Sequence, residues 1–151
     1  MDHRIARLKS PDECEQFAKN VAGRDVALAR QARRRAVELK AAMHGIESDV
    51  QTEALRAVYA YEEVLAARHH KKLPATRTWQ LIRKQGVLGA LEAIVERDTE
   101  PDVLNAVFTA LAEMDMLDFA FESVVLRYPH LFKPLTVERA RLHLQDFNAF
   151  R

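Results

Sequence analysis

The side chains with the clearest capacity for chemistry are cations gathered in one stretch of the chain. No Asp or Glu occurs between Glu63 and Glu92, whereas Lys and Arg recur there with two threonines and a tryptophan among them. Cations, hydroxyl groups and free N–H groups at a helix start are the groups that bind phosphates. We therefore define residues 68–84 as the basic segment and as a candidate nucleic-acid-binding site. Its candidate residues are Arg68, Lys71, Lys72, Thr76, Arg77, Thr78, Trp79, Arg83 and Lys84.

The tryptophan of this segment adds a second kind of contact. At about 100° per residue, Leu81 and Ile82 define the buried side of a helix that begins near Thr76, and Trp79 and Arg83 lie one turn apart toward its flank. An indole in that position is available to stack on Arg83 or on a base. The alternative is that this single tryptophan anchors the core and the cations only solvate its rim.

Residues for catalysis or metal binding are not grouped in this sequence. Glu62 and Glu63 are adjacent, so on a helix they diverge by about 100° and do not form an acid–base pair. Glu62 and His69 stand roughly 10 Å apart along a helix, too far to share one metal ion. Cys14 has no histidine nearby in sequence, and no glycine-rich phosphate loop or nucleophile motif occurs. The sequence therefore identifies no catalytic residue, metal ligand or cofactor, favours a non-enzymatic protein, and assigns Glu62 and His69 no chemical role.

A second group of cations, Arg30, Arg33, Arg34 and Arg35, carries less information. On a helix the first three spread over about 100°, while Arg35 lies on the opposite flank. This pattern is typical of a solvated, ion-paired helix face rather than of a binding stripe.

Composition limits the partners that the protein can have. Of 151 residues, 48% are apolar and 30% are charged, with 23 Lys and Arg against 22 Asp and Glu. Dedicated non-specific DNA binders are usually markedly basic, so this balance leaves room only for a small phosphate-binding footprint. A single cysteine excludes an internal disulfide and fits a reducing compartment. With no apolar run of about 20 residues, we expect a cytoplasmic protein with no membrane partner.

The elements that must position the basic segment are helices. With 4 Gly and 5 Pro, the chain has too few turn residues for many short strands. Capping residues and apolar periodicity predict helices over about 11–22, 25–45, 48–69, from Thr76 or Thr78 to 86, 87–97, 99–114, 118–128, and from Thr136 onward. The predicted fold is all-α, a compact orthogonal bundle or a short helical array of seven to eight helices.

The chain is expected to form a single helical domain over residues 1–151. Within it we predict a basic helix–loop–helix segment at about 48–86 and an apolar packing segment at about 87–151. The predicted core residues lie on periodic apolar stripes: Leu39, Leu65, Leu111, Phe119, Val125 and Leu144.

Several short motifs carry a resemblance. They are Tyr61-Glu62-Glu63-Val64-Leu65, the basic loop with residues 77–82 and Gly86, the run 118–122, and Val125-Leu126-Arg127-Tyr128-Pro129. Together they resemble a family of small, uncharacterised bacterial all-helical proteins over roughly residues 30–147. The resemblance implies a bacterial, single-domain, all-α protein and brings no activity with it.

Two functional hypotheses follow. The first is an accessory protein that binds DNA or RNA through the phosphates with the basic segment. The second is a non-enzymatic interaction module, either a homodimer or a partner of another protein, whose apolar C-terminal helices supply the contact. They differ in whether the cations of the basic segment converge on one exposed face.

Overall fold

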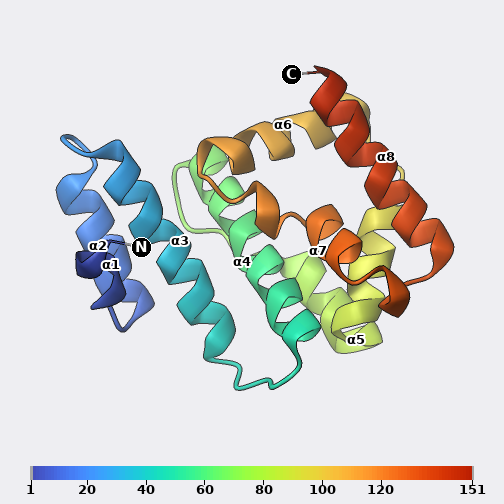
Figure 1. Cartoon of the computed structure of the whole chain (residues 1–151), viewed down its shortest axis with the longest axis horizontal. Helices are drawn as coiled ribbons and strands as arrows, with labels where there is room; N and C mark the ends of the chain where they lie inside the picture. Colours follow the sequence, from blue (N-terminus) through green and yellow to red (C-terminus); the bar gives the residue numbers. More distant parts are fainter. Residues whose placement is uncertain (1, 151) are drawn as a thin grey trace.

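The computed structural model describes residues 2–150, and all regular structure in this range is helical (Figure 1). The all-α prediction of seven to eight helices is therefore confirmed. The α-helices are α1 His3–Ala6, α2 Pro11–Val21, α3 Val26–Ala42, α4 Asp49–His69, α5 Thr76–Glu96, α6 Pro101–Glu113, α7 Phe121–Arg127 and α8 Pro134–Phe150. Two short 3₁₀ turns, η1 Leu117–Phe119 and η2 Pro129–Leu131, flank α7.

Side-chain caps begin the helices of the N-terminal half. The Ser10 hydroxyl accepts a hydrogen bond from the Glu13 N–H at 3.2 Å, and the Asp25 carboxylate accepts one from the Leu28 N–H at 3.0 Å. The Ser48 hydroxyl accepts the Gln51 N–H at 3.5 Å. Each cap satisfies a backbone donor that has no partner within its own helix. These three caps were the start signals predicted for α2, α3 and α4.

The two helices predicted on either side of Gly86 are the halves of α5. Gly86 interrupts the helical backbone with φ 80° and ψ 170°. A residue with a Cβ rarely adopts this conformation, so glycine permits the chain to bend there and continue as a helix. The loop of residues 70–75 before α5 begins at His70, which is left-handed with φ 57°.

The start of α8 differs from the prediction. Thr136 was expected to cap this helix, but α8 begins at Pro134 and Thr136 is fully buried in its first turn. Its hydroxyl donates to Oε1 of Glu96 at 2.7 Å, so the threonine joins α8 to the end of α5. Helix α1, which is only four residues long, was not predicted.

Three apolar clusters form the core. One lies within α1–α3, at the left of Figure 1, and two lie where α4 packs against the C-terminal helices. Of the predicted core residues, Leu111, Phe119 and Val125 are buried, whereas Leu39, Leu65 and Leu144 are only partly buried. The helix α4 therefore holds the α1–α3 unit and the C-terminal helices together.

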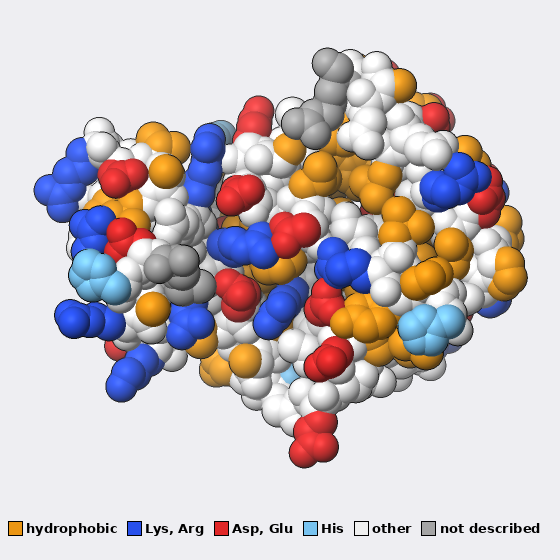
Figure 2. Space-filling model, in the orientation of Figure 1, with side chains coloured by type: hydrophobic (Ala, Val, Ile, Leu, Met, Phe, Trp, Pro, Cys, Tyr) orange, Lys and Arg blue, Asp and Glu red, His pale blue; other side chains and the backbone are white. Residues whose placement is uncertain are grey.

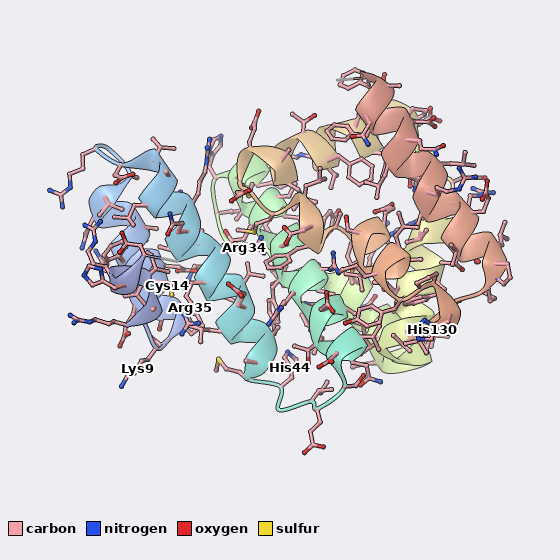
Figure 3. The ribbon with its side chains drawn as sticks, in the orientation of Figure 1. Lys9, Cys14, Arg34, Arg35, His44 and His130 are labelled. Atoms are coloured by element: carbon pink, nitrogen blue, oxygen red, sulfur yellow. The ribbon has the colours of Figure 1, made fainter. Side chains whose placement is uncertain are left out.

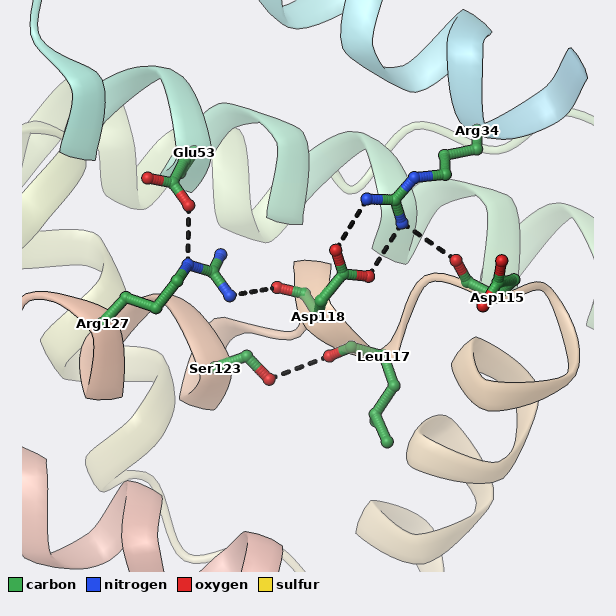
Figure 4. Close-up of polar contacts among 7 residues, drawn as sticks. All are labelled: Arg34, Glu53, Asp115, Leu117, Asp118, Ser123 and Arg127. Carbon is green, nitrogen blue, oxygen red and sulfur yellow. Dashed lines mark hydrogen bonds and ion pairs between the residues drawn. The ribbon is translucent and has the colours of Figure 1, made fainter. Parts of the chain in front are cut away.

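Polar contacts from α3 strengthen this junction. Arg34 extends from α3 toward the C-terminal helices (Figure 3), where it forms a bidentate ion pair with Asp118 and donates to the backbone oxygen of Asp115 (Figure 4). Its guanidinium also lies 4.0 Å from the centre of the Phe119 ring. Arg127 continues the network by donating to Glu53 of α4 and to the backbone oxygen of Asp118, each at 2.7 Å.

Charged and apolar side chains gather over different helices. In Figure 2 many Lys and Arg side chains lie over α1–α3, and the broadest apolar areas lie over the C-terminal helices. Large exposed side chains there include Leu135 and Leu142, seven residues apart on α8. Self-assembly through this part stays a prediction. Within residues 2–150, no helix has the combined length and apolar character that crossing a membrane requires.

Candidate functional site

The cations of the basic segment lie at the end of α4, in the following loop and on the first half of α5. Five of them are exposed and have no ion-pair partner among residues 2–150: Arg68, Lys71, Arg77, Arg83 and Lys84. The sixth, Lys72, is also exposed, but its Nζ lies 2.9 Å from a carboxylate oxygen of Glu15 on α2. Most of the predicted phosphate-binding cations are therefore free to contact an external anion.

The structure places Trp79 differently from the stacking position proposed on the sequence. Its indole N–H donates to Oε2 of Glu62 at 2.8 Å, and the same oxygen accepts the Ala75 N–H at 2.7 Å. The ring is partly buried and stacks on His44, in the connection between α3 and α4 (Figure 3), with centroids 5.8 Å apart. Trp79 therefore fixes the start of α5 through its hydrogen bond to Glu62.

The two threonines of the segment separate. Thr76 is exposed, and its hydroxyl donates to the backbone oxygen of Pro74 at 3.5 Å. Thr78 is only 6% exposed and lies away from the surface on which the sequence placed it, because it faces the interior between α4 and α5. The predicted nine-residue site is thus not a single face.

Part of the basic segment lines an open space that we call the charged cleft, with a volume of about 790 Å³. Lys71 and Lys72 contribute to it, whereas the cations of α5 do not. Its other charged residues are Glu15, Lys19, Arg33, Lys40, Glu62 and Glu63. The six cations of residues 68–84 therefore do not all converge on one place.

Acidic side chains offset the positive charge of the charged cleft. Lys40 lies 3.7 Å from Glu15 and 3.8 Å from Glu63. Burial is the largest single effect on the Glu15 carboxyl group and raises its pKa, but the hydrogen bond with Lys72 and the charges of the nearby lysines together outweigh burial and lower the pKa. For Glu63 burial dominates and raises the pKa, with Lys40 offsetting only part of the rise. An anion in this cleft would have to displace carboxylates that already hold two of its lysines.

A second space lies deeper, among α4, α5, α6, α7 and α8, and has a volume of about 350 Å³. We call it the α6 pocket because α6 contributes most of its apolar wall. The apolar lining consists of Ala57, Ile94, Val103, Leu104, Val107, Phe108, Leu111, Ala120 and Phe121. A concave, mainly apolar space of this size is typical of sites that bind small molecules.

A nearly buried carboxylate faces this pocket. The side chain of Glu122 on α7 is 6% exposed, and its Oε2 lies 2.9 Å from Nδ1 of His143 on α8. Its other oxygen, Oε1, has no hydrogen-bond partner among residues 2–150. Because buried carboxylates are normally paired through most of their lone pairs, this oxygen has unused capacity to accept a hydrogen bond.

Two hydroxyl groups in the α6 pocket also lack partners. Within the described part of the chain, neither the buried Thr78 hydroxyl nor the partly buried Tyr61 hydroxyl makes a hydrogen bond. The remaining ring nitrogen of His143, Nε2, has none either. Four polar side chains from four helices thus line one mainly apolar space, and each has a hydrogen-bonding atom without a partner in the described part of the chain.

No family model, curated protein or solved structure matches this chain. We therefore infer the function from the chemistry of the charged cleft and the α6 pocket. No three His, Cys, Asp or Glu side chains within residues 2–150 form a group that could hold a metal ion. The α6 pocket is the better developed site, because its wall is mainly apolar and its polar side chains keep unused hydrogen-bonding atoms, whereas the lysines and carboxylates of the charged cleft are largely paired with one another.

Few features of the sequence indicate this pocket. Glu122 is the only charged residue in the otherwise largely apolar run 119–126, which lies within a predicted helix. A charged side chain on the buried side of an apolar helix is a signal in itself, because it needs a partner. His143 stands 21 residues later, at a spacing that no sequence rule connects to Glu122.

Proposed function

We propose that the protein binds a small, largely apolar molecule in the α6 pocket. The observation that carries this proposal is the meeting of four incompletely bonded polar side chains, Tyr61, Thr78, Glu122 and His143, in one apolar space. The free atoms of these side chains face the pocket, and a ligand with matching groups would satisfy them. The same groups would fix the orientation of the ligand while the apolar wall supplies most of the binding free energy.

The size of the pocket supports a compact organic ligand. Its volume of 350 Å³ is roughly twice that of an engineered apolar cavity that holds benzene. Val103, on the wall formed by α6, is half exposed, so the pocket is reached from solvent along this helix. A molecule of one or two rings with a short polar end would fill such a space.

Binding of a neutral apolar dye tests the proposal. We expect N-phenylnaphthylamine to show saturable fluorescence enhancement with the wild-type protein. Leu104→Trp fills the pocket from α6 and should weaken the dye affinity by roughly tenfold or more, since the added ring occupies the space of the ligand. Leu135→Trp adds the same ring at an exposed position of α8 outside the pocket and is the matched control.

The result has a clear contrary outcome. Dye binding that is absent, or that falls equally in the two variants, would show that the α6 pocket is not the binding site. Circular dichroism of both variants establishes that they remain folded. A pocket filled only by ordered water would give no saturable dye signal, because the dye would not displace it.

A second candidate function is contact with nucleic-acid phosphates by the exposed cations of the basic segment. It is favoured by the absence of acidic partners, within residues 2–150, for Arg68, Lys71, Arg77, Arg83 and Lys84. Arg77 and Lys84 stand seven residues apart, so they project from nearly the same side of α5. Trp79 has no part in this version of the hypothesis, since its indole is already bonded to Glu62.

A salt titration tests this second candidate. Affinity for a short oligonucleotide should fall steeply as salt rises, because each phosphate contact releases a condensed counterion. Replacing Arg77 and Lys84 together by Ala should lower the magnitude of the slope by roughly one to two units. Arg141→Ala removes an exposed arginine that is paired with Glu138 and should leave the slope unchanged. An equal reduction of the slope in the double variant and in Arg141→Ala, or no oligonucleotide binding at low salt, would exclude nucleic acid as a partner.

A further inference from the structure

The charge of the α6 pocket points to a class of ligand, and this inference rests on the proposed function. The pocket is lined by three carboxylates, Asp98, Glu100 and Glu122, and by one guanidinium, that of Arg97. The first two carboxylates belong to exposed residues at its rim, whereas Glu122 is nearly buried inside. The three carboxylates outnumber Arg97, and they leave an excess of negative charge even though Asp98 also pairs with Arg139 at 3.6 Å. Such a pocket attracts a cation and disfavours an anion of the same shape.

Glu122 supplies the centre of this preference. A carboxylate only accepts hydrogen bonds, so the contact with His143 places the proton on Nδ1 of the histidine. In the neutral ring this leaves Nε2 as a second acceptor, with no partner among residues 2–150. Oε1 of Glu122 and Nε2 of His143 are thus both able to accept from a ligand, and so are the Thr78 and Tyr61 hydroxyls.

We propose that the α6 pocket binds a primary amine carried on an apolar, preferably aromatic, body. An ammonium group has three donors and one positive charge, which match the free oxygen of Glu122 and the neighbouring acceptors. The aromatic rings of Tyr61, Phe108 and Phe121 line the same space and would contact the apolar body or the face of the cation. The ammonium–carboxylate contact would be strong because it forms away from bulk water.

Three probes of nearly equal shape separate this class from its competitors. They are phenethylamine, phenethyl alcohol and hydrocinnamate, which carry an ammonium, a hydroxyl and a carboxylate on the same phenethyl body. Titrations by calorimetry or ligand-observed NMR at about pH 7 should rank the amine tightest and the carboxylate weakest. We expect the amine to bind roughly 10- to 100-fold more tightly than the alcohol, the range that corresponds to a charge-assisted hydrogen bond.

A single variant assigns the preference to Glu122. Glu122→Gln keeps an acceptor for His143 and the shape of the side chain, but removes the charge. The affinity for phenethylamine should fall to within a few fold of the affinity for phenethyl alcohol. The affinity for phenethyl alcohol itself should remain nearly unchanged. Glu138→Gln, on the exposed side of α8, is the matched control and should change neither affinity. Ethylamine, which has the charge without the ring, should bind far more weakly than phenethylamine.

The outcomes distinguish the two proposals. If the wild-type protein binds all three phenethyl probes equally, or binds hydrocinnamate best, the pocket binds ligands but amine recognition is excluded. If it binds the dye but none of the three, amine recognition is likewise overturned. If neither the dye nor any probe binds, the proposed function itself fails. The ranking on the wild-type chain needs no substitution, so it stands even if Glu122→Gln impairs folding.

Discussion

Glu62 organises the loop that precedes α5. One of its oxygens accepts from both the Ala75 N–H and the Trp79 indole N–H, so a single carboxylate fixes the loop end and the first turn of the helix. Trp79 in turn packs against the His44 and Tyr59 rings, which also contact each other. The three aromatic side chains and the carboxylate therefore connect the α3–α4 loop to the start of α5.

We expect Glu62→Ala to destabilise the fold by about 2 kcal/mol, because two partly buried N–H donors lose a charged acceptor. Since Trp79 is the only tryptophan, its fluorescence should also shift to longer wavelength as water reaches the indole. Urea unfolding followed by circular dichroism measures the first effect. Glu62→Gln, which retains an acceptor, should lower the free energy of unfolding by less than Glu62→Ala. Glu47→Ala, at an exposed position, should leave it almost unchanged. A loss in Glu47→Ala as large as that in Glu62→Ala would contradict this role.

Single residues of the candidate sites were the hardest to predict. Arg77 and Lys84 are exposed as their charge alone predicts, because charged side chains remain solvated wherever the helix lies. The helix projection put Trp79 toward the flank but did not reveal its partners, since a threonine or a tryptophan is compatible with either environment. The buried side of the first half of α5 is set by its packing against α4 and by the bend at Gly86. Both are features of the tertiary structure.

At the scale of elements, local rules were largely sufficient. Ser10, Asp25 and Ser48 each have a short polar side chain that accepts from the N–H group three residues on, so their capping role is independent of the rest of the fold. Thr136 has the same chemistry, but Glu96 on another helix competes for its hydroxyl. Local prediction fails where a long-range partner outcompetes the local one.

The bend in α5 provides an element-scale prediction. Gly86 has φ 80° and ψ 170°, a backbone conformation that is almost restricted to glycine. No atom lies within 4 Å of where a Cβ would be, so backbone strain alone should set the effect of adding one. Gly86→Ala should therefore lower the free energy of unfolding by about 1–3 kcal/mol in chemical denaturation.

Gly23→Ala is the control for this substitution. Gly23 likewise has no neighbouring atom where a Cβ would be, and its φ is not positive. Alanine there should be neutral or slightly stabilising, because it reduces the freedom of the unfolded chain. Equal effects at the two positions would show that the bend at Gly86 imposes no strain.

At the scale of the whole molecule, the α6 pocket illustrates what one sequence does not reveal. Its lining comes from five helices between residues 57 and 143. Every one of those helices was predicted, yet the pocket depends on how they pack, which periodicity does not specify. The cations at 68–84 could be recognised from the sequence because they are close together along the chain. Two of them, Lys71 and Lys72, line part of the charged cleft, which is the less enclosed of the two spaces.

The ion pair between Arg34 and Asp118 is the main polar contact that joins α3 to the C-terminal helices (Figure 4). The hydrogen bond from Arg34 lowers the pKa of the Asp118 carboxyl group below its usual 3.8, despite the opposing effect of burial. A carboxyl group whose pKa is lower in the folded state stabilises the fold above its unfolded pKa and loses this contribution as pH falls through the folded pKa. The contact should therefore be intact at pH values above about 4 and should weaken below that.

This behaviour predicts a pH-dependent joint between the α1–α3 unit and the rest of the molecule. At about pH 6, Asp118→Asn should lower the free energy of unfolding by about 1 kcal/mol, a modest value because both side chains are partly exposed. The difference from wild type should shrink as pH falls below 3.8, where the wild-type carboxyl group also becomes protonated. Amide hydrogen exchange above that pH should be faster in α2 and α3 of the variant and nearly unchanged in the core of α4, because the lost contact releases only the N-terminal unit. Asp146→Asn, at an exposed position of α8, should have no such effect. A stability difference that persists unchanged to low pH, or uniform acceleration of exchange, would show that Asp118 acts through the fold as a whole rather than through its ion pair with Arg34.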